Sequence, residues 1–599
     1  MNREYYTGSG DQFQDQFGKL FPELQEEVFN NNENDITSRN DLMVKNITFV
    51  TTEACNLACT YCFTGDTLVT MNDYTTKKIK DIEIGDKILG FKEYPTNFIG
   101  SSSVVESIVE QKYTRKAAVI NIKFTNGIIN VTEDHPILIF RRNKYTYVSA
   151  KTLKKNDVCL RFNPTSKKIE KTIVLSITNN NGKVDVYNIG TSTKTYIANE
   201  ICVHNCYESH KTPRIMTRDV AKKAIDCIFD EEKMNGYLNY KKHKAVIIEF
   251  IGGEPFLNID VMEFIAEYFL YKATELNHPW KSHYMFSVTT NGTLLLKDDR
   301  VKNWIDKYKN RLSIGITIDG DKKLHDSCRI YHDGRGSYDD VVEAVKYAID
   351  EFNMDNTKVT FAPENISKIN TAIPHLFNLG LTDIHANCVY EDVWKPGDDK
   401  ELYDQLKQLA DYIIDNDLYK DHYCSIFDES IGKPMEPTDN NNWCGGDGSM
   451  LAISVDGKFF PCIRYMRYAM TGTYDREEMI IGNVEKGVES KDKNKYLIQL
   501  SGITRKSQST EECFNCSVAR GCSWCTAFNY LVFGTPNKRA TFICIMHKAR
   551  VAANVYFWNK LYRKIGLKDR FKLHLSKEDC LKFISENEYD ALIKLQEDD

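Results

Sequence analysis

One cysteine of this chain belongs to two different sequence patterns at once. The stretch CNLACTYCFTGDTLV, residues 55–69, places Cys55, Cys59 and Cys62 in a CxxxCxxC spacing. Cys62 also opens a long block of different character, which ends just before the cysteine of the stretch CVHNCYESH, Cys206. A fold for this chain must therefore explain why two cysteines, Cys62 and Cys206, are offered for one position.

The block between about residues 64 and 200 differs in its pattern of apolar and polar residues from the sequence after it. It reads as short strands joined by polar turns, with almost no helical periodicity. After residue 206, apolar runs that end in polar or glycine-rich residues alternate with helical segments, which predicts a parallel sheet. Six such strands are expected, and the first is separated from the other five by the all-β block: 46–52, 244–255, 283–293, 312–321, 357–363 and 382–390.

The all-β block contains a faint internal repeat. Residues 79–91 and 150–162 each carry a spaced apolar pair, then Gly-Asp or Asn-Asp, then a second apolar pair. The repeat predicts two similar hairpin units in a pseudo-symmetric β-fold, although chance similarity is an alternative explanation.

Composition restricts the class of protein. A chain of 599 residues is too long for one hydrophobic core, so three or more domains are expected. The net charge of −6 gives no general basic face and argues against a nucleic-acid partner. No apolar run is long enough for a membrane span, and residues 1–17 lack the apolar core of a signal peptide, so a cytoplasmic protein is expected.

The 18 cysteines favour metal binding over disulfides, because they occur at short spacings in a chain without an export signal. Three lie near residue 60 and seven lie between residues 444 and 544. The isolated cysteines are instead expected to be buried apolar residues: Cys159, Cys227, Cys328, Cys388 and Cys580.

The edges of the all-β block carry residues that can rearrange a peptide backbone. A thiol can attack the preceding carbonyl and form a thioester, a second thiol can take over the acyl group, and an Asn side chain can cyclise and cut the chain after itself. Cys62, Cys206 and Asn205 stand at the required positions. Proton transfer needs a histidine near each bond, and His135 and His204 are the candidates.

These residues resemble an intein, a splicing domain with the Hint fold. CFTGDTLV resembles the opening motif, NVTEDHPI the internal Thr-xx-His motif, and VYNIGTSTKTYIANEICVHNC the closing motifs. The resemblance covers residues 62–205 and implies a mini-intein. By this resemblance Cys62 forms a thioester with Tyr61, Thr132 and His135 activate that bond, and Cys206 receives the acyl group. Asn205 then cyclises with help from His204.

Two features of the insertion follow from this comparison. Many inteins carry a Tyr-Asp pair and a later histidine where this chain has Asn188 and Lys194, so slower or differently organised splicing is expected. Joining Tyr61 to Cys206 would restore the CxxxCxxC spacing as Cys55, Cys59 and Cys206. The host sequence would have no normal cysteine site until the insertion leaves.

CxxxCxxC directly after a first strand, with an aromatic residue beside the last cysteine, resembles the radical S-adenosylmethionine (radical SAM) superfamily. Three thiolates can hold a [4Fe–4S] cluster with one open iron. The resemblance implies a partial TIM-like (β/α)6 barrel, which matches the six expected strands. A zinc site is the alternative, with His210 as the nearest fourth ligand after splicing.

Further motifs follow the later strands in radical SAM order. Gly252 and Gly253 of GGEP permit close backbone approach, and Glu254 could hold the ammonium group of SAM. Asn291 of TTNGTLL is a candidate pocket residue, and turn formation is its alternative role, as it is for Asp319. By resemblance, two more residues contact the ribose and carboxylate of SAM: Thr317 and Arg329.

The late cysteines resemble a SPASM domain, which carries auxiliary iron–sulfur clusters in radical SAM enzymes that modify peptides. The family topology implies one cluster on Cys513, Cys516, Cys522 and Cys544. A second would lie on Cys444, Cys462 and Cys525, with Cys424 or an open site as the fourth position. The spacing from Cys522 to Cys525 is one residue shorter than usual. A zinc ribbon is the alternative for this region.

The resemblance extends to the reaction. Sulfatase-maturing relatives place an Asp after the cysteine that corresponds to Cys462, whereas this chain has Ile463. The stretches ANCVYEDVW and CYE are closer to peptide maturases of CXXX-repeat precursors, which form thioether cross-links in a ribosomal peptide. Expected partners are that peptide and an electron donor such as flavodoxin or ferredoxin. A different radical SAM peptide modification, such as a carbon–carbon cross-link, and a non-catalytic metal-stabilised peptide binder are the alternatives.

The expected domain order is therefore an interrupted host. Residues 1–61 are an N-terminal segment with the first part of the radical SAM domain, and 62–205 are the intein. Residues 206–423 continue the barrel, 424–550 form the SPASM domain, and 551–599 form a helical tail.

Overall fold

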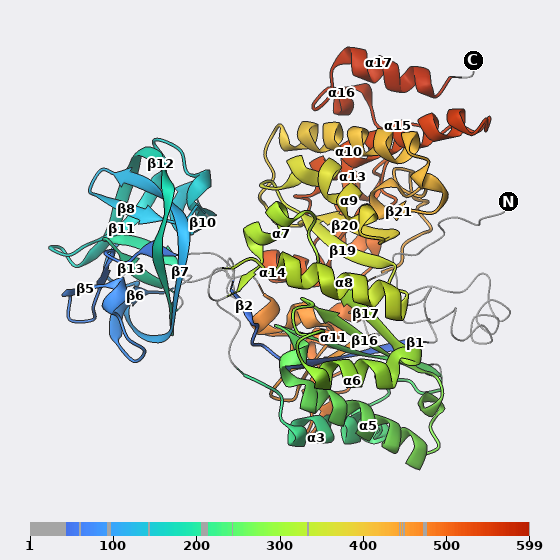
Figure 1. The fold of residues 1–599 in the computed structure, drawn as a ribbon, viewed down its shortest axis with the longest axis horizontal. Coiled ribbons are helices and arrows are strands. Elements are labelled where there is room, and N and C mark those ends of the chain that lie inside the picture. The colour runs from blue at the N-terminus through green and yellow to red at the C-terminus, as the bar shows by residue number, and fades with distance from the viewer. Residues whose placement is uncertain are drawn as a thin grey trace.

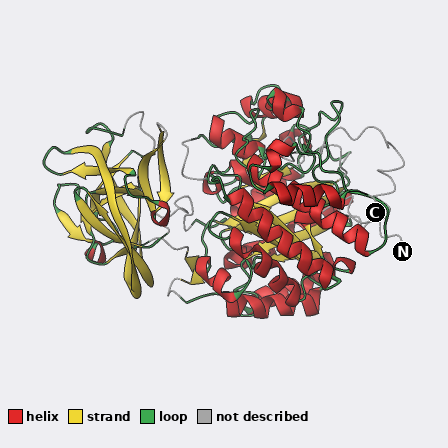
Figure 2. Cartoon of the chain, turned by 90° about the horizontal axis from the view of Figure 1, so that it is seen from above, coloured by secondary structure: helices red, strands yellow, loops and turns green. Residues whose placement is uncertain are grey.

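The computed structural model describes residues 44–58, 62–92, 98–133, 135–141, 144–193, 195–204, 214–241, 243–331, 335–442, 444, 446, 450–470 and 476–597. These residues form an all-β domain and an α/β host, which lie beside each other in both views (Figures 1 and 2). Among them, no helix is both long and apolar enough to cross a membrane, and no two cysteines form a disulfide.

The host sheet contains the expected parallel strands. Its order is β17-β16-β15-β1-β22-β23-β24-β25, and β19, β20 and β21 form a second sheet. All six strands expected from sequence are present, with the sheet ladder interrupted between β17 and β19, where Thr357 Oγ1 donates to Ile316 O at 2.9 Å. The strands are β1 Val44–Thr52, β2 Leu57–Ala58, β15 Ala245–Gly252, β16 Tyr284–Thr290, β17 Leu312–Ile316, β18 Ile330–Tyr331, β19 Asn356–Phe361, β20 Asp383–Cys388, β21 Tyr423–Cys424, β22 Met450–Ile453, β23 Lys458–Phe460, β24 Gly482–Asn483 and β25 Gly487–Val488.

Helices enclose these strands (Figure 2). Side chains that alternate along β15, such as Val246, Ile248 and Phe250, are fully buried and share one core with residues of α5 such as Ile265. The helices are α3 Arg218–Ile228, α4 Glu231–Met234, α5 Ile259–Glu275, α6 Asp299–Tyr308, α7 Lys322–Cys328, α8 Tyr338–Phe352, α9 Ile369–Asn378, α10 Asp398–Asp415, α11 Lys495–Ser501, α12 Arg505–Gln508, α13 Glu511–Phe514, α14 Thr526–Phe533, α15 Cys544–Lys564, α16 Lys577–Cys580 and α17 Glu586–Leu595.

The C-terminal region is continuous with the barrel. β22 pairs in parallel with β1, from Asn46 opposite Met450 to Phe49 opposite Ile453. The first barrel strand is therefore flanked on its far side by the cysteine-rich region. α15 runs through the expected boundary between residues 550 and 551, so one helix carries Cys544 at its start and continues into the tail.

The all-β domain is built mainly from one long strand pair. β7 and β12 pair in antiparallel register and β3 joins them. Separate buried clusters lie among its strands: one around Phe63 and Val203, another around Phe162 and Cys202, and a smaller one in which Cys62 packs with residues of β7 and β12. The elements are β3 Phe63–Thr64, β4 Leu68–Thr70, β5 Thr76–Lys78, η2 Ile79–Asp81, β6 Lys87–Phe91, β7 Val104–Phe124, β8 Gly127–Val131, β9 Pro136–Arg141, β10 Lys144–Ser149, η3 Ala150–Thr152, β11 Val158–Asn163, β12 Lys168–Thr191, β13 Thr195–Ala198 and β14 Ile201–His204.

The internal repeat is visible in the backbone. Each copy is a short 3-10 turn, η2 or η3, followed by a strand, β6 or β11. The Asp86 carboxylate accepts from the Glu83 amide, and the Asp157 carboxylate accepts from the Lys154 amide, both at 2.8 Å. In β7, Val109 O accepts from the Gly85 amide and the Val109 amide donates to Asp86 O. In β12, Val174 makes the same pair of bonds with Asn156 and Asp157. The prediction of a pseudo-symmetric β-fold is confirmed.

The host segments on either side of the insertion are held together directly. The Glu53 amide donates to Arg214 O at 3.0 Å and the Met216 amide donates to Thr51 O at 2.9 Å. The Arg214 guanidinium also lies 2.6 Å from a Glu53 carboxylate oxygen. The two flanks therefore meet at the end of β1 while the insertion is still in the chain.

Candidate functional site

The first junction cysteine lies inside the all-β domain. Cys62 is 3% exposed. Its amide donates to Thr132 Oγ1 at 2.8 Å, and its carbonyl accepts from the Thr132 amide at 2.9 Å. Thr132 therefore fixes both backbone groups of Cys62, including the nitrogen of the bond to residue 61.

His135 lies beside this pair. Its ring is fully buried and its centroid is 4.2 Å from that of Phe63, which follows Cys62. Burial, together with the nearby His204, lowers the pKa of His135 to about 3, and both ring nitrogens are buried without a hydrogen-bond partner among the described residues. A neutral imidazole can accept a proton near Cys62.

His204 ends β14, opposite Thr195 of β13. It is 4% exposed, and its ring meets Tyr147 edge to face at 4.8 Å between centroids. Asn188, at the position where this chain departs from many inteins, is buried and accepts from Tyr196 Oη at 3.2 Å. The structure thus brings Cys62, Thr132, His135 and His204 into one region, whereas Tyr61, Lys194, Asn205 and Cys206 lie outside the described residues.

In the host, the loop after β1 is tied to the end of β16. Asn291 Nδ2 donates to Asn56 Oδ1 at 2.8 Å and lies 3.8 Å from Cys55 Sγ. Asn56 in turn donates to Thr293 Oγ1 at 2.8 Å. Asn291 therefore contacts the predicted cluster cysteine directly. The sequence did not predict this role for Asn56. Its position beside Cys55 was the one feature that pointed to it. Cys59, the second cysteine of the motif, lies outside the described residues.

Glu254 has a structural task in addition to its predicted one. Its fully buried carboxylate accepts from Thr290 Oγ1 at 2.7 Å, from the Asn291 amide at 2.8 Å and from the Phe256 amide at 3.2 Å. Burial raises its pKa to about 7, although these hydrogen bonds lower it. Glu254 thus joins the ends of β15 and β16, and its contact with a cofactor remains a prediction.

Gly252 and Gly253, which precede Glu254, are required because the neighbouring backbone leaves no room for a side chain. A Cβ on Gly252, whose φ is +154°, would lie 2.0 Å from Thr52 O. A Cβ on Gly253 would lie 2.0 Å from Ala54 O. Because any side chain would collide with backbone here, both glycines let β15 pack against the loop that carries Cys55.

Arg329 and Asp319 form an ion pair after β17. Arg329 Nε lies 2.5 Å from an Asp319 carboxylate oxygen. Burial raises the pKa of Asp319, but the Arg329 charge and hydrogen bond prevail and lower it. The next residue, Ile330, pairs with Ala58 of β2, which brings Arg329 close to the cysteine loop. Thr317 is half-buried, and its amide donates to Thr290 O at 3.0 Å.

The thiols that shift the pKa values of the late cysteines belong to the same expected group, and cluster binding by each group stays a prediction. Burial raises the pKa of Cys462, and the thiols of Cys444 and Cys525 raise it further. Cys444 Sγ also lies 3.0 Å from Thr526 Oγ1, which follows Cys525. Burial likewise raises the pKa of Cys522 to about 11, where Arg539 opposes the neighbouring thiols Cys544, Cys513 and Cys516.

The donor chemistry fits iron–sulfur clusters, whose ligands are cysteine thiolates. Among the described residues, however, no three Cys, His, Asp or Glu side chains converge as metal ligands do. Cys424 lies elsewhere, buried in β21, where Arg550 and Asp383 are the charges that act on it. The thiols are therefore grouped, and a role for Cys424 at the fourth position stays a prediction.

A protein-family model, the Hint module, matches residues 51–221. The chain carries a Hint module. Three curated proteins are also similar to it, and the chain spans 56%, 29% and 50% of their lengths respectively. An uncharacterized protein of Methanocaldococcus jannaschii is 24% identical over 31% of this chain. A cysteine-type anaerobic sulfatase-maturating enzyme of Clostridium novyi is 30% identical over 20%. The radical SAM cyclopropyl synthase TigE of Paramaledivibacter caminithermalis is 20% identical over 43%.

Solved structures also resemble parts of this chain. A bacterial intein-like domain from Clostridium thermocellum is 23% identical, with a TM-score of 0.20, and covers 24% of this chain and 98% of its own. The anSMEcpe structure with bound AdoMet is 17% identical, with a TM-score of 0.40, and covers 59% and 91%. The Hint module is thus inserted into a host that is related in sequence to radical SAM maturases.

Proposed function

We propose that residues 62–205 excise themselves and join Tyr61 to Cys206. The observation that carries this proposal is the pair of hydrogen bonds between Cys62 and Thr132. The Cys62 thiol adds to the Tyr61 carbonyl, the carbon–nitrogen bond breaks, and the proton passes to the Cys62 nitrogen. Thr132 holds that nitrogen in place, and the neutral ring of His135, which packs against Phe63 next to Cys62, would move the proton.

The remaining steps use the second junction. The Cys206 thiol takes the acyl group from Cys62, which recovers its own thiol. The Asn205 side-chain nitrogen attacks the Asn205 carbonyl and releases the Cys206 amine, with His204 placed to transfer protons. The acyl group then moves from sulfur to that amine and forms the new peptide bond. No oxidant or reductant is needed at any step.

Excision would create the host's cysteine site. In the precursor Cys62 is buried in the Hint module, so it is unable to join Cys55 and Cys59 around a cluster. After splicing Cys206 takes that position. The contacts between residues 51–53 and 214–216 support a host that needs little rearrangement, because its flanks are already joined.

We propose that the spliced host is a radical SAM peptide maturase. A [4Fe–4S] cluster with S-adenosylmethionine, bound by Cys55, Cys59 and Cys206, would supply one-electron cleavage of the sulfonium and hydrogen abstraction. Asn291 fixes the loop of Cys55, and Glu254 fixes Asn291. Arg329, oriented by Asp319, is placed to meet a carboxylate near this loop. The residues Gly252, Gly253 and Thr317 complete the proposed cofactor surroundings.

The substrate we propose is a Cys-containing ribosomal peptide, modified by thioether cross-linking in the cytoplasm with flavodoxin or ferredoxin as electron donor. The cysteine groups around Cys462 and Cys522 would hold two auxiliary clusters. Ile463 argues against sulfatase-type maturation, although one relative is a sulfatase-maturating enzyme. A thioether cross-link and a carbon–carbon cross-link each remove two hydrogens from the peptide, so the two products have the same mass. The thiol count separates them, because it falls by one only when a thioether forms.

Intact mass after anaerobic expression with iron tests the splicing proposal. Wild type should yield a 455-residue product and a 144-residue fragment, while the variant Cys62→Ala with Asn205→Ala should remain at 599 residues. A wild-type chain that stays at full length would contradict splicing. The spliced product should then bind iron and sulfide and cleave S-adenosylmethionine. A spliced product without iron would leave a metal-free or zinc-stabilised binding protein as the better description.

A further inference from the structure

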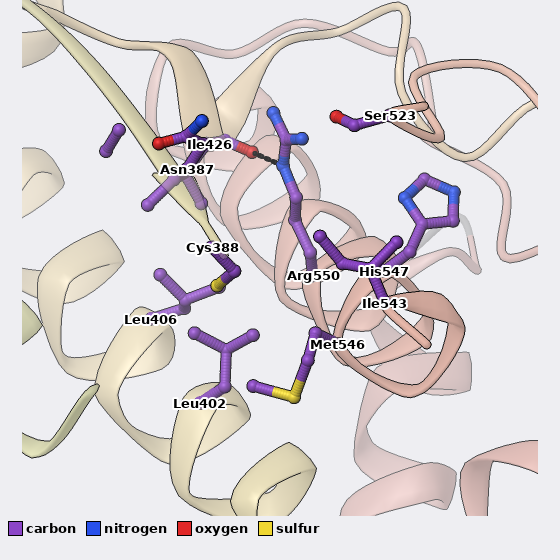
Figure 3. A pocket seen from close by; sticks show the side chains of 11 residues that line it. Asn387, Cys388, Leu402, Leu406, Ile426, Ser523, Ile543, Met546, His547 and Arg550 are labelled. Carbon is purple, nitrogen blue, oxygen red and sulfur yellow. Dashed lines mark hydrogen bonds between the residues drawn. The ribbon is translucent and has the colours of Figure 1, made fainter. Parts of the chain in front are cut away.

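A cavity lies in the host where β20, α10 and α15 meet the loop between Cys522 and Cys525 (Figure 3). The space open to the centres of water molecules is about 40 Å³. That is about three water-sized spheres, enough for a group of a few heavy atoms. None of the residues that line it has a part in the proposed splicing site or in the cysteine loop after β1.

The lining is apolar on one side and cationic on the other. Leu402, Leu406 and Met546 lie below the Arg550 guanidinium in the view of Figure 3, and Asn387 and Ser523 lie to either side. Arg550 is the one lining side chain with a charge at neutral pH among the described residues. No described acidic side chain lines this space.

Histidine adds no second charge. His547 also lines the cavity, and burial lowers its pKa to about 4. It is therefore neutral at pH 7, and its Nε2 lies 2.7 Å from Val518 O, which can accept a hydrogen bond from it.

The guanidinium is only partly used by the protein. Nε donates to Ile426 O at 3.0 Å, and Nη2 donates to Ser425 O. Within the described part of the chain, Nη1 has no acceptor and no carboxylate lies within ion-pair distance of Arg550. The nearby Asp428 carboxylate instead accepts from Tyr423 Oη at 3.2 Å and from the Ser430 amide at 2.8 Å.

Arg550 is half-buried, and a guanidinium that faces a cavity without a counter-ion is unfavourable, because partial desolvation penalises its charge and no opposite charge offsets that penalty. Hydrogen bonds to two carbonyl groups do not by themselves account for an arginine side chain at this position. Arg505 shows the difference, because it is buried and uses Nε, Nη1 and Nη2 on the carbonyls of Asp439, Phe514 and Glu436. Arg550 keeps one nitrogen for another acceptor.

We propose that this cavity binds a carboxylate carried on a short aliphatic chain. The carboxylate would accept from Arg550 Nη1, with Ser523 and Asn387 as further polar neighbours. The aliphatic part would contact Leu402, Leu406 and Met546. The ligand is either a free short-chain carboxylic acid or the acidic side chain of a peptide. The proposal does not depend on splicing or on radical chemistry.

Isothermal titration of the full chain with sodium butyrate tests this site, with butyramide at equal ionic strength as the neutral probe. Butyrate should bind saturably and butyramide at least tenfold more weakly. Arg550→Lys should weaken butyrate binding at least tenfold, because an ammonium lacks the planar fork of donors. The matched variant Arg505→Lys should change it by less than twofold.

A second variant keeps the test valid if Arg550→Lys unfolds the chain. Leu406→Phe narrows the cavity from α10 and leaves both carbonyl bonds of Arg550 intact, and it should also weaken butyrate binding at least tenfold. Absence of butyrate binding to wild type, equal binding of butyramide, or unchanged binding by Leu406→Phe would each overturn the proposal. Competition by N-acetylglutamate α-amide would identify a peptide side chain as the source, and its failure to compete a free acid.

Discussion

Thr132 and Cys62 are joined by two hydrogen bonds that run in opposite directions. Thr132 Oγ1 accepts from the Cys62 amide at 2.8 Å, and the Cys62 carbonyl accepts from the Thr132 amide at 2.9 Å. The Thr132 side chain thereby holds the nitrogen of the bond proposed to break, and the Thr132 backbone holds the carbonyl on the other side of Cys62. The pair joins positions 70 residues apart in the sequence.

Removal of the Thr132 hydroxyl should slow splicing. Thr132→Ala loses one hydrogen bond to the leaving nitrogen, which is worth about 1–1.5 kcal/mol and corresponds to about a tenfold lower rate. Thr132→Ser should splice within a few fold of wild type. The exposed Thr178→Ala in β12 is the matched control. The fraction of precursor over time, followed by intact mass, measures the rate, and equal rates for all three variants would sink this role for Thr132.

Stability of the Hint module should fall as the pH decreases. His135 has a folded pKa of about 3 against an ordinary value of 6.5, so the unfolded state binds more protons between these values. Stability should therefore drop below pH 6.5 by up to about 1.4 kcal/mol per pH unit. Hydrogen exchange of peptides from β14, in the Cys62→Ala variant with Asn205→Ala, reports this change.

His135→Phe provides the comparison for that measurement. The ring is buried beside Phe63, so an aromatic replacement keeps much of the packing. The variant should lose most of the pH dependence between 6.5 and 4. If the slope is unchanged, another group causes it.

The host should show the opposite dependence on pH. Glu254 has a folded pKa of about 7 against 4.5, so the folded state binds more protons between these values. Stability should decrease as the pH rises from 4.5 to about 7, by up to about 3 kcal/mol, and then level off. Glu254→Gln should remove this trend. Tryptophan fluorescence during urea unfolding measures it, because all six tryptophans lie outside residues 62–205.

Gly253→Ala should damage the cysteine loop. Its Cβ would lie 2.0 Å from Ala54 O and 2.4 Å from Ala54 C, and backbone cannot yield as a flexible side chain can. We expect the free energy of unfolding to fall by about 3 kcal/mol or more. The spliced protein should also lose iron. Gly502→Ala is the control, because nothing lies within 4 Å of the added carbon. Iron content equal to that control would show that the loop tolerates the shift.

The two groups of late cysteines should lose iron independently. Cys462→Ala with Cys525→Ala should remove about one cluster's iron, and so should Cys513→Ala with Cys516→Ala. Combining all four changes should give the sum of the two losses of iron, because the thiols that act on Cys462 and those that act on Cys522 belong to separate groups. Iron and sulfide analysis of anaerobically purified protein measures this. Complete loss after either pair alone would contradict separate sites.

The sequence by itself determined the elements and their types. Period-two and apolar runs specify the all-β insertion and the six host strands, because strand character depends on nearby residues. The Gly-Asp and Asn-Asp turns at Asp86 and Asp157 specify the repeat for the same reason. Short cysteine spacings also placed Cys513, Cys516 and Cys522 together, since the intervening chain is too brief to separate them.

Only the tertiary structure decided how distant segments meet. Glu53 contacts Arg214 across 161 positions, and β22 takes the place beside β1. Glu254 turned out to join two strand ends, Arg329 to pair with Asp319, and Cys62 to be buried in the inserted domain. These contacts depend on which surfaces the folded chain brings within a few ångströms of each other. Local sequence patterns do not specify which residues far apart in the chain become neighbours.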